Sequence, residues 1–179
     1  MNRSLRVILV TASLSLGGVP CASAEVAGKQ TSNTGHFEVQ APIDKVFPLF
    51  DPLNEPKWSP DFRMTPIYPL PFVVAKDAIF ATARHGGHDA TWVINLYEPV
   101  SYRIEYLLFK PDFQVRRISI ACVSLAPNRT AVSVTYRVTG VSEQGNRHLS
   151  DYGPEFIAEW GPAIAAYFAG QTHHATRAN

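Results

Sequence analysis

The chain has 179 residues, of which 46% are hydrophobic and 17% charged, and its formal net charge is +1. This length and composition suit one domain with a substantial core, and no repeat or low-complexity tract interrupts the sequence. A near-neutral chain gives no electrostatic reason to expect nucleic acid or an anionic membrane as a partner, and we expect no nucleic acid partner.

The first 24 residues are predicted to be a cleavable signal peptide. Arg3 and Arg6 form a short basic start, and residues 7–16 are an apolar run too short to span a bilayer. The Ala22-Ser23-Ala24 triplet supplies the small-x-small pattern of a cleavage site after Ala24. A retained anchor or a lipoprotein attached at Cys21 are the alternatives. We therefore expect a periplasmic or secreted protein without stable membrane insertion.

Cleavage leaves residues 25–179, with 14 Lys and Arg against 15 Asp and Glu. Cys122 is then the only cysteine, so no intramolecular disulfide is possible, and we expect a buried thiol. Polar residues 25–35 are predicted to be a flexible leader and 171–179 a disordered tail, which leaves 36–170 as one domain. The sequence gives no indication of the oligomeric state.

The domain is predicted to open with a strand and a short helical segment. Phe37 and Val39 alternate with polar neighbours, and the strand ends at Ala41-Pro42. The segment that follows carries Val46, Phe47, Leu49 and Phe50 at helical spacing. Six prolines between residues 51 and 71 exclude long regular elements there, and Trp58 is expected to pin this stretch to the core.

Four strands follow, and their registers can be derived from the turns between them. The His85-Gly86-Gly87-His88 turn sets Arg84 against Asp89, Ala81 against Trp92 and Ile79 against Ile94. The Glu98-Pro99-Val100 turn sets Leu96 against Tyr102, Ile94 against Ile104 and Trp92 against Tyr106. The last two turns set Tyr106 against Ile118, Leu108 against Arg116, Cys122 against Val132, Ile118 against Tyr136 and Arg116 against Val138.

These registers predict one apolar and one polar face, because a slip of one residue would reverse the segregation. The polar face holds Asn95, Arg103, Glu105, Arg117, Ser119, Ser133, Thr135 and Arg137. The apolar face holds Ile79, Ala81, Trp92, Ile94, Leu96, Ile104, Tyr106, Leu108, Ile118, Ile120, Val132, Val134, Tyr136 and Val138.

A final helix is predicted from about Asp151 to Phe168, with a kink at Gly161-Pro162. Its apolar stripe must cover the concave face of the sheet, since no other element can do so. The fold class is therefore α+β. The stripe consists of Phe156, Ile157, Trp160, Ile164, Tyr167 and Phe168.

Residues 36–169 resemble the START-like, or Bet v 1-like, superfamily, in the branch labelled SRPBCC or polyketide cyclase/dehydrase. The resemblance rests on the segments HFEVQAPIDKVFPLFDPLNEPKW, TWVINLYEPVSYRIEY and TAVSVTYRVTGVSEQG and on the terminal helix. It implies a helix-grip fold, in which a curved antiparallel sheet of about seven strands wraps around a long C-terminal helix above a deep cavity. Members bind lipids, sterols, polyketides or hormones, and a minority are enzymes. No universal catalytic residue exists to carry over.

The registers place Trp92, Tyr106 and Tyr136 in one transverse row, with Ile118 between the tyrosines. Such a row suits the aromatic wall of a small-molecule pocket, although these rings can equally pack against the final helix. Arg116 either meets a ligand or extends to solvent. The predicted pocket lining is Trp92, Ile94, Tyr102, Tyr106, Leu108, Arg116, Ile118, Tyr136, Phe156 and Trp160.

No metal site or cofactor is expected. His85 and His88 flank a turn, but no further ligand has the spacing to complete a zinc site. The acids nearest a pocket mouth, Asp61, Asp151 and Glu155, are expected to be solvated.

Two functions are the main hypotheses, and a domain with a collapsed cavity that works through its surface is a third possibility. The first is an exported binding or carrier protein for a small hydrophobic molecule, lipid-, sterol- or polyketide-like. The second is a cyclase or dehydratase-type enzyme acting on a polyketide-like or aromatic substrate in the same cavity. A titratable pocket group with a perturbed pKa and a second group within hydrogen-bond reach would indicate the enzyme. The predicted inner face of the sheet has no His, Asp or Glu, which favours binding over catalysis.

Overall fold

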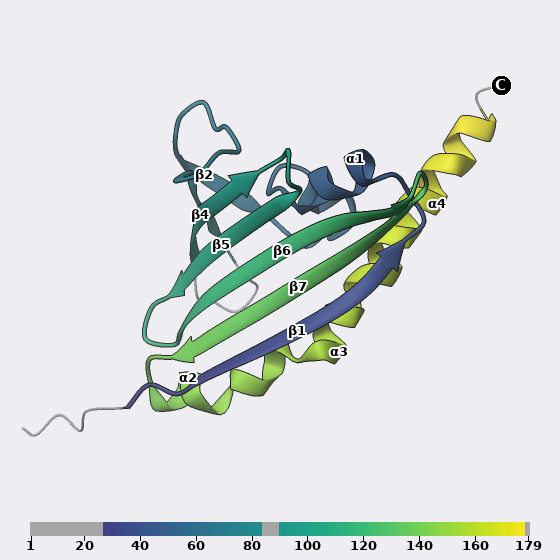
Figure 1. The fold of residues 1–179 in the computed structure, drawn as a ribbon. Helices are drawn as coiled ribbons and strands as arrows, with labels where there is room; N and C mark the ends of the chain where they lie inside the picture. The colour runs from purple at the N-terminus through teal and green to yellow at the C-terminus, as the bar shows by residue number, and fades with distance from the viewer. Residues whose placement is uncertain (1–26, 84–89, 178–179) are drawn as a thin grey trace, which may run out of the picture.

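The structure is a computed structural model that describes residues 27–83 and 90–177. Its seven strands form a single antiparallel sheet in the order β1-β7-β6-β5-β4-β3-β2. The sheet is curved, and the C-terminal helices cross its concave face (Figure 1). This confirms the α+β class and the predicted arrangement of sheet and helix. The strands are β1 (Gln30–Val39), β2 (Met64–Tyr68), β3 (Ile79–Thr82), β4 (Ala90–Glu98), β5 (Arg103–Lys110), β6 (Gln114–Ala126) and β7 (Arg129–Gly140).

The helical elements lie in two groups, one between β1 and β2 and the other after β7. The first group comprises α1 (Ile43–Val46) and the 3-10 helices η1 (Phe47–Phe50) and η2 (Glu55–Lys57). The second comprises α2 (Glu143–Arg147), η3 (Leu149–Tyr152), α3 (Pro154–Ala158) and α4 (Trp160–Arg177). None of the helices in the described ranges has the length and hydropathy needed to cross a bilayer.

The registers of the central hairpins are confirmed. Tyr106 pairs with Ile118, and Ile118 pairs with Tyr136 on the next strand. Arg116 lies between Leu108 and Val138. The apolar side chains of these strands are buried on the concave face, as the alternation predicted.

The register of β3 with β4 was wrong by one residue. Phe80, rather than Ala81, pairs with Trp92, and Ile79 pairs with Val93. Phe80 is therefore the buried side chain of β3, while Ile79 and Ala81 are only partly buried. Residues 79–81 are all apolar, so segregation of polar from apolar side chains does not distinguish the two registers. The predicted turn at 85–88 and the Arg84–Asp89 pair lie outside the described residues.

The register of β4 with β5 was wrong by two residues, and a bulge then shifts it further. Trp92 pairs with Leu108 and Ile94 with Tyr106. A two-residue slip keeps the same side chains inward, so the pattern could not detect it. The bulge lies at Asn95, and beyond it Leu96 pairs with Glu105 and Tyr97 with Ile104. Leu96 was predicted to lie on the inner face, but the bulge moves it to the outer face.

β1 begins at Gln30, within the segment predicted as a flexible leader. It pairs with β7 along its whole length, from Gln30 opposite Thr139 to Val39 opposite Thr130. The backbone of residues 30–35 is therefore held by sheet hydrogen bonds, which the polar composition of these residues did not indicate.

The short helical segment after β1 fills one end of the concave face. Val46, Phe47, Leu49 and Phe50 are all buried there, as their spacing predicted. The proline-rich segment after it holds η2 and the five-residue strand β2, and Trp58 ties it to the core by donating from Nε1 to the Leu49 carbonyl at 2.7 Å.

The terminal helix is broken slightly earlier than predicted. α3 ends at Ala158 and α4 begins at Trp160, so that Pro162 lies in the first turn of α4, where a backbone N–H is not required. α4 continues past Phe168 to Arg177. Gly35 permits the close approach of α3 to β1, because a Cβ there would lie 2.6 Å from the Ile157 side chain.

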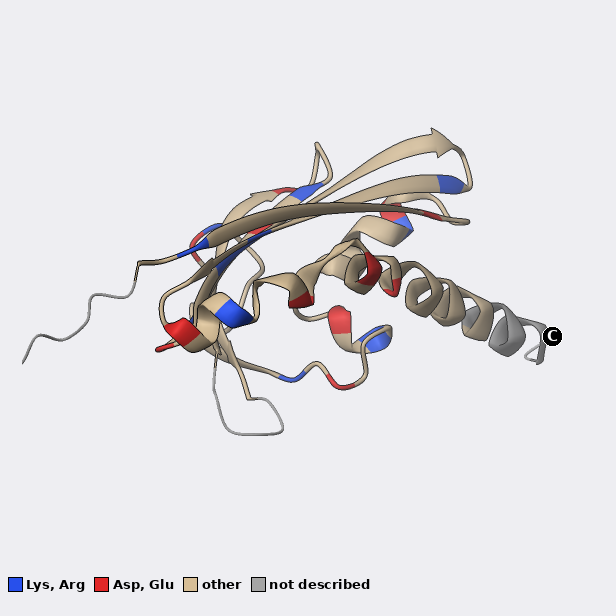
Figure 2. Ribbon diagram, turned by 90° about the horizontal axis from the view of Figure 1, so that it is seen from below, with Lys and Arg blue, Asp and Glu red and all other residues tan. Residues whose placement is uncertain are grey.

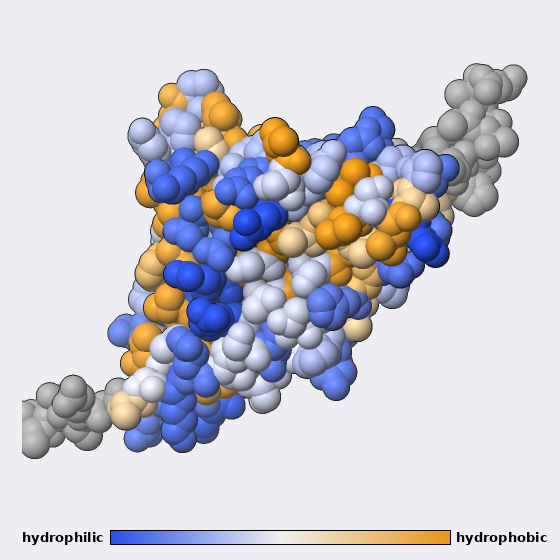
Figure 3. All heavy atoms as spheres, in the orientation of Figure 1, coloured by the Kyte–Doolittle hydropathy of each residue, from blue (hydrophilic) through white to orange (hydrophobic). Residues whose placement is uncertain are grey.

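The outer face of the sheet is mostly polar. Figure 3 shows hydrophilic side chains along the middle of this face and hydrophobic ones gathered toward the end at which β6 and β7 turn. Val123 and Leu125 are exposed at that end.

Candidate functional site

A cavity of about 490 Å³ lies between the concave face of the sheet, the segment 55–63 and the helices α3 and α4. This volume lies within the range of small-molecule sites. The cavity is lined by Glu55, Trp58, Ser59, Pro60, Asp61, Phe62, Arg63, Thr82, Ala83, Ala90, Trp92, Leu108, Lys110, Arg116, Ile118, Tyr136, Tyr152, Phe156, Glu159, Trp160 and Ala163.

Most of the predicted lining residues do line this cavity. They are Trp92, Leu108, Arg116, Ile118, Tyr136, Phe156 and Trp160. Three others, Ile94, Tyr102 and Tyr106, do not. Ile94 is completely buried, and Tyr102 lies in the β4–β5 turn with its ring edge against Phe47, at a centroid distance of 5.7 Å.

The two tyrosines of the transverse row have different surroundings. The Tyr106 hydroxyl donates to the Phe50 carbonyl at 2.7 Å and is sealed in the core. Tyr136 is only 5% exposed and borders the cavity. Its hydroxyl has no hydrogen-bond partner within residues 27–83 and 90–177, so this hydroxyl is a polar group that a molecule in the cavity can reach.

Trp92 lies one row away from the two tyrosines, not in their row as predicted, because it pairs with Leu108 while Ile94 pairs with Tyr106. Its ring nevertheless meets the Tyr106 ring edge-on, at a centroid distance of 5.7 Å. It also stacks on Phe80 at 5.5 Å, and its Nε1 donates to Thr82 Oγ1 at 2.9 Å. These contacts fix the ring as one wall of the cavity.

The opposite wall is built from aromatic rings of β7 and the terminal helices. Tyr136 stacks on Tyr152 at 5.4 Å and meets Phe156 and Trp160 edge-on at 5.7 Å and 6.1 Å. The ring centroids of Trp160 and Trp58 are also 5.4 Å apart. These rings pack together as the alternative interpretation expected, yet they leave the cavity beside them. A flat apolar molecule would meet rings on both sides.

Arg116 is held on the inner face and does not extend to solvent, since it is 8% exposed. Its Nε donates to Gln114 Oε1 at 3.0 Å, and the guanidinium lies over the Tyr152 ring, 4.0 Å from the centroid. Gln114 is itself completely buried, and its Nε2 donates to the carbonyls of Gly145 and His148. The cation therefore has a fixed position on the cavity floor.

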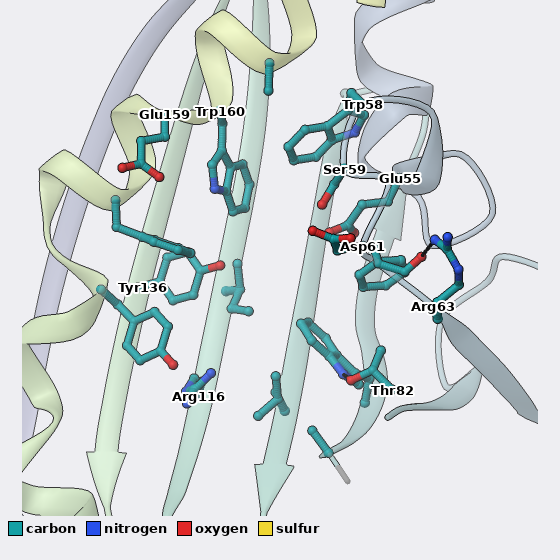
Figure 4. A pocket seen from close by; sticks show the side chains of 18 of the residues that line it. Glu55, Trp58, Ser59, Asp61, Arg63, Thr82, Arg116, Tyr136, Glu159 and Trp160 are labelled. Atoms are coloured by element: carbon teal, nitrogen blue, oxygen red, sulfur yellow. Dashed lines mark hydrogen bonds between the residues drawn. The ribbon is translucent and has the colours of Figure 1, made fainter. Parts of the chain in front are cut away.

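The sequence analysis missed Glu55, an acid in the cavity wall. It lies on η2, and Figure 4 shows it on the wall opposite Tyr136 and Trp160, together with Ser59 and Asp61. Burial raises the pKa of Glu55 to about 8, and the nearby charge of Asp51 adds to the rise. At neutral pH the carboxyl is therefore mostly protonated. Asp51 stays tied to its own loop, where it accepts hydrogen bonds from the backbone N–H groups of Leu53 and Asn54.

The sequence carried one usable signal for this acid. Trp58 was expected to pin its segment to the core, and Glu55 lies three residues earlier, on the same 3-10 turn. Of the three acids predicted near a mouth, Asp61 is exposed and lines the cavity, whereas Asp151 and Glu155 do not line it. The Asp151 carboxylate instead forms a hydrogen bond with the His148 side chain, with Oδ2 3.0 Å from Nδ1.

Two parts of the chain lie below the sheet in Figure 2, the 51–63 segment and the terminal helices. Both carry acidic residues. Among the described residues, no group of three or more His, Cys, Asp or Glu is arranged to hold a metal ion. His85 and His88 lie outside that part of the chain. Cys122 is buried, and burial raises the pKa of its thiol to about 12, so it has little thiolate character.

No model of a known protein family and no curated protein matches the sequence. Solved structures match the fold. Norcoclaurine synthase from Thalictrum flavum, in complex with dopamine and hydroxybenzaldehyde, has a TM-score of 0.63 and 12% identity, with 93% of this chain and 98% of that chain covered. ZhuI aromatase/cyclase from Streptomyces sp. R1128 has a TM-score of 0.57 and 15% identity, covering 84% and 98%. Ara h 8.0201 has a TM-score of 0.59 and 10% identity, covering 79% and 99%.

These likenesses confirm the expected fold. The chain has the Bet v 1-like helix-grip architecture, with an open seven-stranded antiparallel sheet around a broken C-terminal helix. At such low identity the fold alone is shared, so the chemistry of the site must be argued from this chain's own residues.

Proposed function

We propose that this Bet v 1-like chain is an exported binding or carrier protein that holds a small hydrophobic molecule in the cavity beside Tyr136. The observation that carries the proposal is the cavity itself, about 490 Å³, walled by Trp92, Phe156 and Trp160 on a fixed scaffold. Apolar walls with a few convergent polar groups are the usual design of a small-molecule site. The solved structures of the same fold support a small-molecule cavity, since one is in complex with dopamine and hydroxybenzaldehyde, although their names suit a binding protein and an enzyme alike.

Native mass spectrometry of the protein purified without denaturation tests binding. We expect a defined hydrophobic molecule at near-equal stoichiometry with the chain. An Ala163→Trp variant, in which an indole is placed in the cavity wall, should carry much less of it. Protein that carries no such molecule and binds none from a lipid extract would contradict the proposal.

Export is a separate part of the proposal, and it rests on the signal pattern before Glu25. N-terminal sequencing of the protein from a periplasmic or culture fraction should give Glu25 as the first residue. Unprocessed chain in the cytoplasmic fraction would contradict it.

Glu55 gives a second candidate, a cyclase or dehydratase-type enzyme in the same cavity. A carboxyl with its pKa near 8 can give up or take a proton at neutral pH, as acid–base catalysis requires. However, no second group within residues 27–83 and 90–177 hydrogen-bonds to this carboxyl, which is why binding is the first candidate. If the protein is an enzyme, the co-purified molecule should be converted on incubation. Glu55→Gln should then stop the conversion without preventing binding.

A further inference from the structure

The Tyr136 hydroxyl is a polar group of the cavity wall, on a side chain that is only 5% exposed. Its side chain is fixed by ring contacts with Tyr152, Phe156 and Trp160. Burial raises the pKa of this hydroxyl, so it stays protonated and donates at any ordinary pH. Because β7 and the helices hold the ring from both sides, the hydroxyl cannot readily turn to another partner.

Glu55 is the counterpart on the facing wall. Figure 4 shows the labelled side chains of Glu55 and Tyr136 on opposite sides of the same space. The two groups also act on each other electrostatically, since the charge of Glu55 is one cause of the raised Tyr136 pKa. In its protonated form Glu55 offers an O–H donor, as Tyr136 does.

The remaining charged groups lie around this pair. Asp61, Arg63 and Glu159 line the rim and are exposed, and Arg63 donates to the carbonyls of Pro60 and Phe62. Lys110 and Arg116 come from β5 and β6, and Arg116 lowers the pKa of Tyr136. A cation near two donors makes this part of the cavity favourable for an electron-rich oxygen. The charge of Asp51 raises the pKa of Glu55, and the charge of Lys57 lowers the pKa of Asp51.

We propose that the cavity binds a planar aromatic molecule through a carbonyl oxygen, which accepts hydrogen bonds from the Tyr136 hydroxyl and from the protonated carboxyl of Glu55. This inference rests on the proposed binding function and adds the chemical class of the ligand. The aromatic walls, with Trp92 on β4 and with Phe156 and Trp160 on the terminal helices, favour a planar body. The two donors require the acceptor.

Two probes of matched shape separate the inference from the proposed function. Methyl naphthyl ketone carries the carbonyl oxygen, and isopropenylnaphthalene replaces this oxygen by a methylene group of similar size. Quenching of the cavity tryptophans measures both affinities. At about pH 6 we expect the ketone to bind at least tenfold more tightly, the difference that about 1.4 kcal/mol of hydrogen bonding gives.

Variants then assign the preference to the two donors. Tyr136→Phe should reduce the ketone preference severalfold, whereas Tyr106→Phe, whose hydroxyl is bonded to Phe50, should keep it. Between about pH 6 and about pH 9.5 the preference should fall in the wild type, because ionised Glu55 no longer donates. Glu55→Gln, which keeps an N–H donor, should hold the preference at both pH values. Asp44→Asn, at an exposed carboxyl on α1 that does not line the cavity, should show the same fall as the wild type.

Equal affinity for ketone and hydrocarbon in the wild type would overturn the inference and leave the proposed function standing. A ketone preference that survives Tyr136→Phe, or that falls with pH in Glu55→Gln as in the wild type, would also overturn it. Failure of both probes to bind would overturn the inference, while the co-purification experiment would still decide the proposed function.

Discussion

The two ends of the concave face are built from the same kind of strand residue but are covered differently. Toward the β4–β5 and β6–β7 turns, Val46, Phe47 and Leu49 of the short α1–η1 segment are buried in one core cluster with Ile104 and Ile120 of the sheet. Toward the β5–β6 turn, α3 and α4 cross above the sheet and leave the cavity beneath them. The long terminal helices cover the curved sheet without filling its concave face. The separate α1–η1 segment, residues 43–50, occupies the other end and is called the plug below.

Tyr106 and Tyr136 show this difference within one row. They lie on either side of Ile118, yet the first is capped by the Phe50 carbonyl of the plug and the second faces the cavity. The same residue type therefore stabilises the fold at one position and is available to a ligand at the other. The following predictions test this contrast.

Truncation of an aromatic ring should cost far more in the filled half. Phe50→Ala removes a side chain that is 1% exposed, and we expect a loss of about 3–5 kcal/mol in the free energy of unfolding. Phe156→Ala should cost less than about half of that, because its half-buried ring already borders open space. Urea denaturation measures both values. Equal losses would mean that the two halves are packed alike.

Removal of one hydroxyl should separate the two tyrosines. Tyr106→Phe leaves the Phe50 carbonyl unsatisfied in the core and should cost about 1–3 kcal/mol of stability. Tyr136→Phe should change stability by less than about 0.5 kcal/mol, since no protein hydrogen bond to this hydroxyl is lost within the described residues. Thermal unfolding of both variants checks the contrast, and a reversed order of the two losses would break it.

The pH dependence of stability should report Glu55. Its folded pKa, about 8, lies above the ordinary value of 4.5, so the folded state holds the proton more tightly than the unfolded state. Stability is therefore greatest below about pH 4.5 for this group and is lost as the pH rises toward 8, at no more than about 1.4 kcal/mol per pH unit.

Glu55→Gln should flatten this decline, which denaturation curves at a series of pH values will measure. Asp44→Asn is the control, because the Asp44 carboxyl is exposed to solvent on α1. A wild-type decline that Glu55→Gln leaves unchanged would show that another group is responsible.

Added volume should be tolerated only in the open half. Ala163→Leu places a larger side chain at the cavity wall, and we expect a change in stability within about 1 kcal/mol together with weaker binding of the naphthyl ketone. Ala41→Leu overpacks a site that is 4% exposed and should cost about 1–3 kcal/mol. Calorimetry and fluorescence titration measure the two effects.

Much of the fold could be predicted from alternation in the sequence. The β5–β6 and β6–β7 registers were correct because polar residues such as Arg117 and Ser119 alternate strictly with buried ones. The register errors, in the β3–β4 and β4–β5 pairs, occurred where alternation could not distinguish the possible registers. Residues 79–81 are apolar throughout, and a bulge at Asn95 shifts β4 without any mark in the pattern.

The candidate site was predictable on the sheet and along the apolar stripe of the terminal helix, which holds Phe156 and Trp160. Trp92, Arg116 and Tyr136 follow from strand parity, because parity decides which face a side chain occupies. Glu55 does not, since it lies on a 3-10 turn between prolines, whose path over the sheet is set by tertiary contacts such as the Trp58–Leu49 hydrogen bond. That parity likewise could not show that the α1–η1 plug seals Tyr106.

The central claim is that one half of the concave face is hollow and receives the ligand. Isotope-edited NMR with selectively labelled methyl groups and bound methyl naphthyl ketone tests it most directly. We predict NOEs from the ligand to the methyl groups of Leu108, Ile118 and Ala163 and none to Ile104 or Ile120, which lie under the plug. Ligand contacts with Ile104 and Ile120, or with no methyl group of the concave face, would contradict the account.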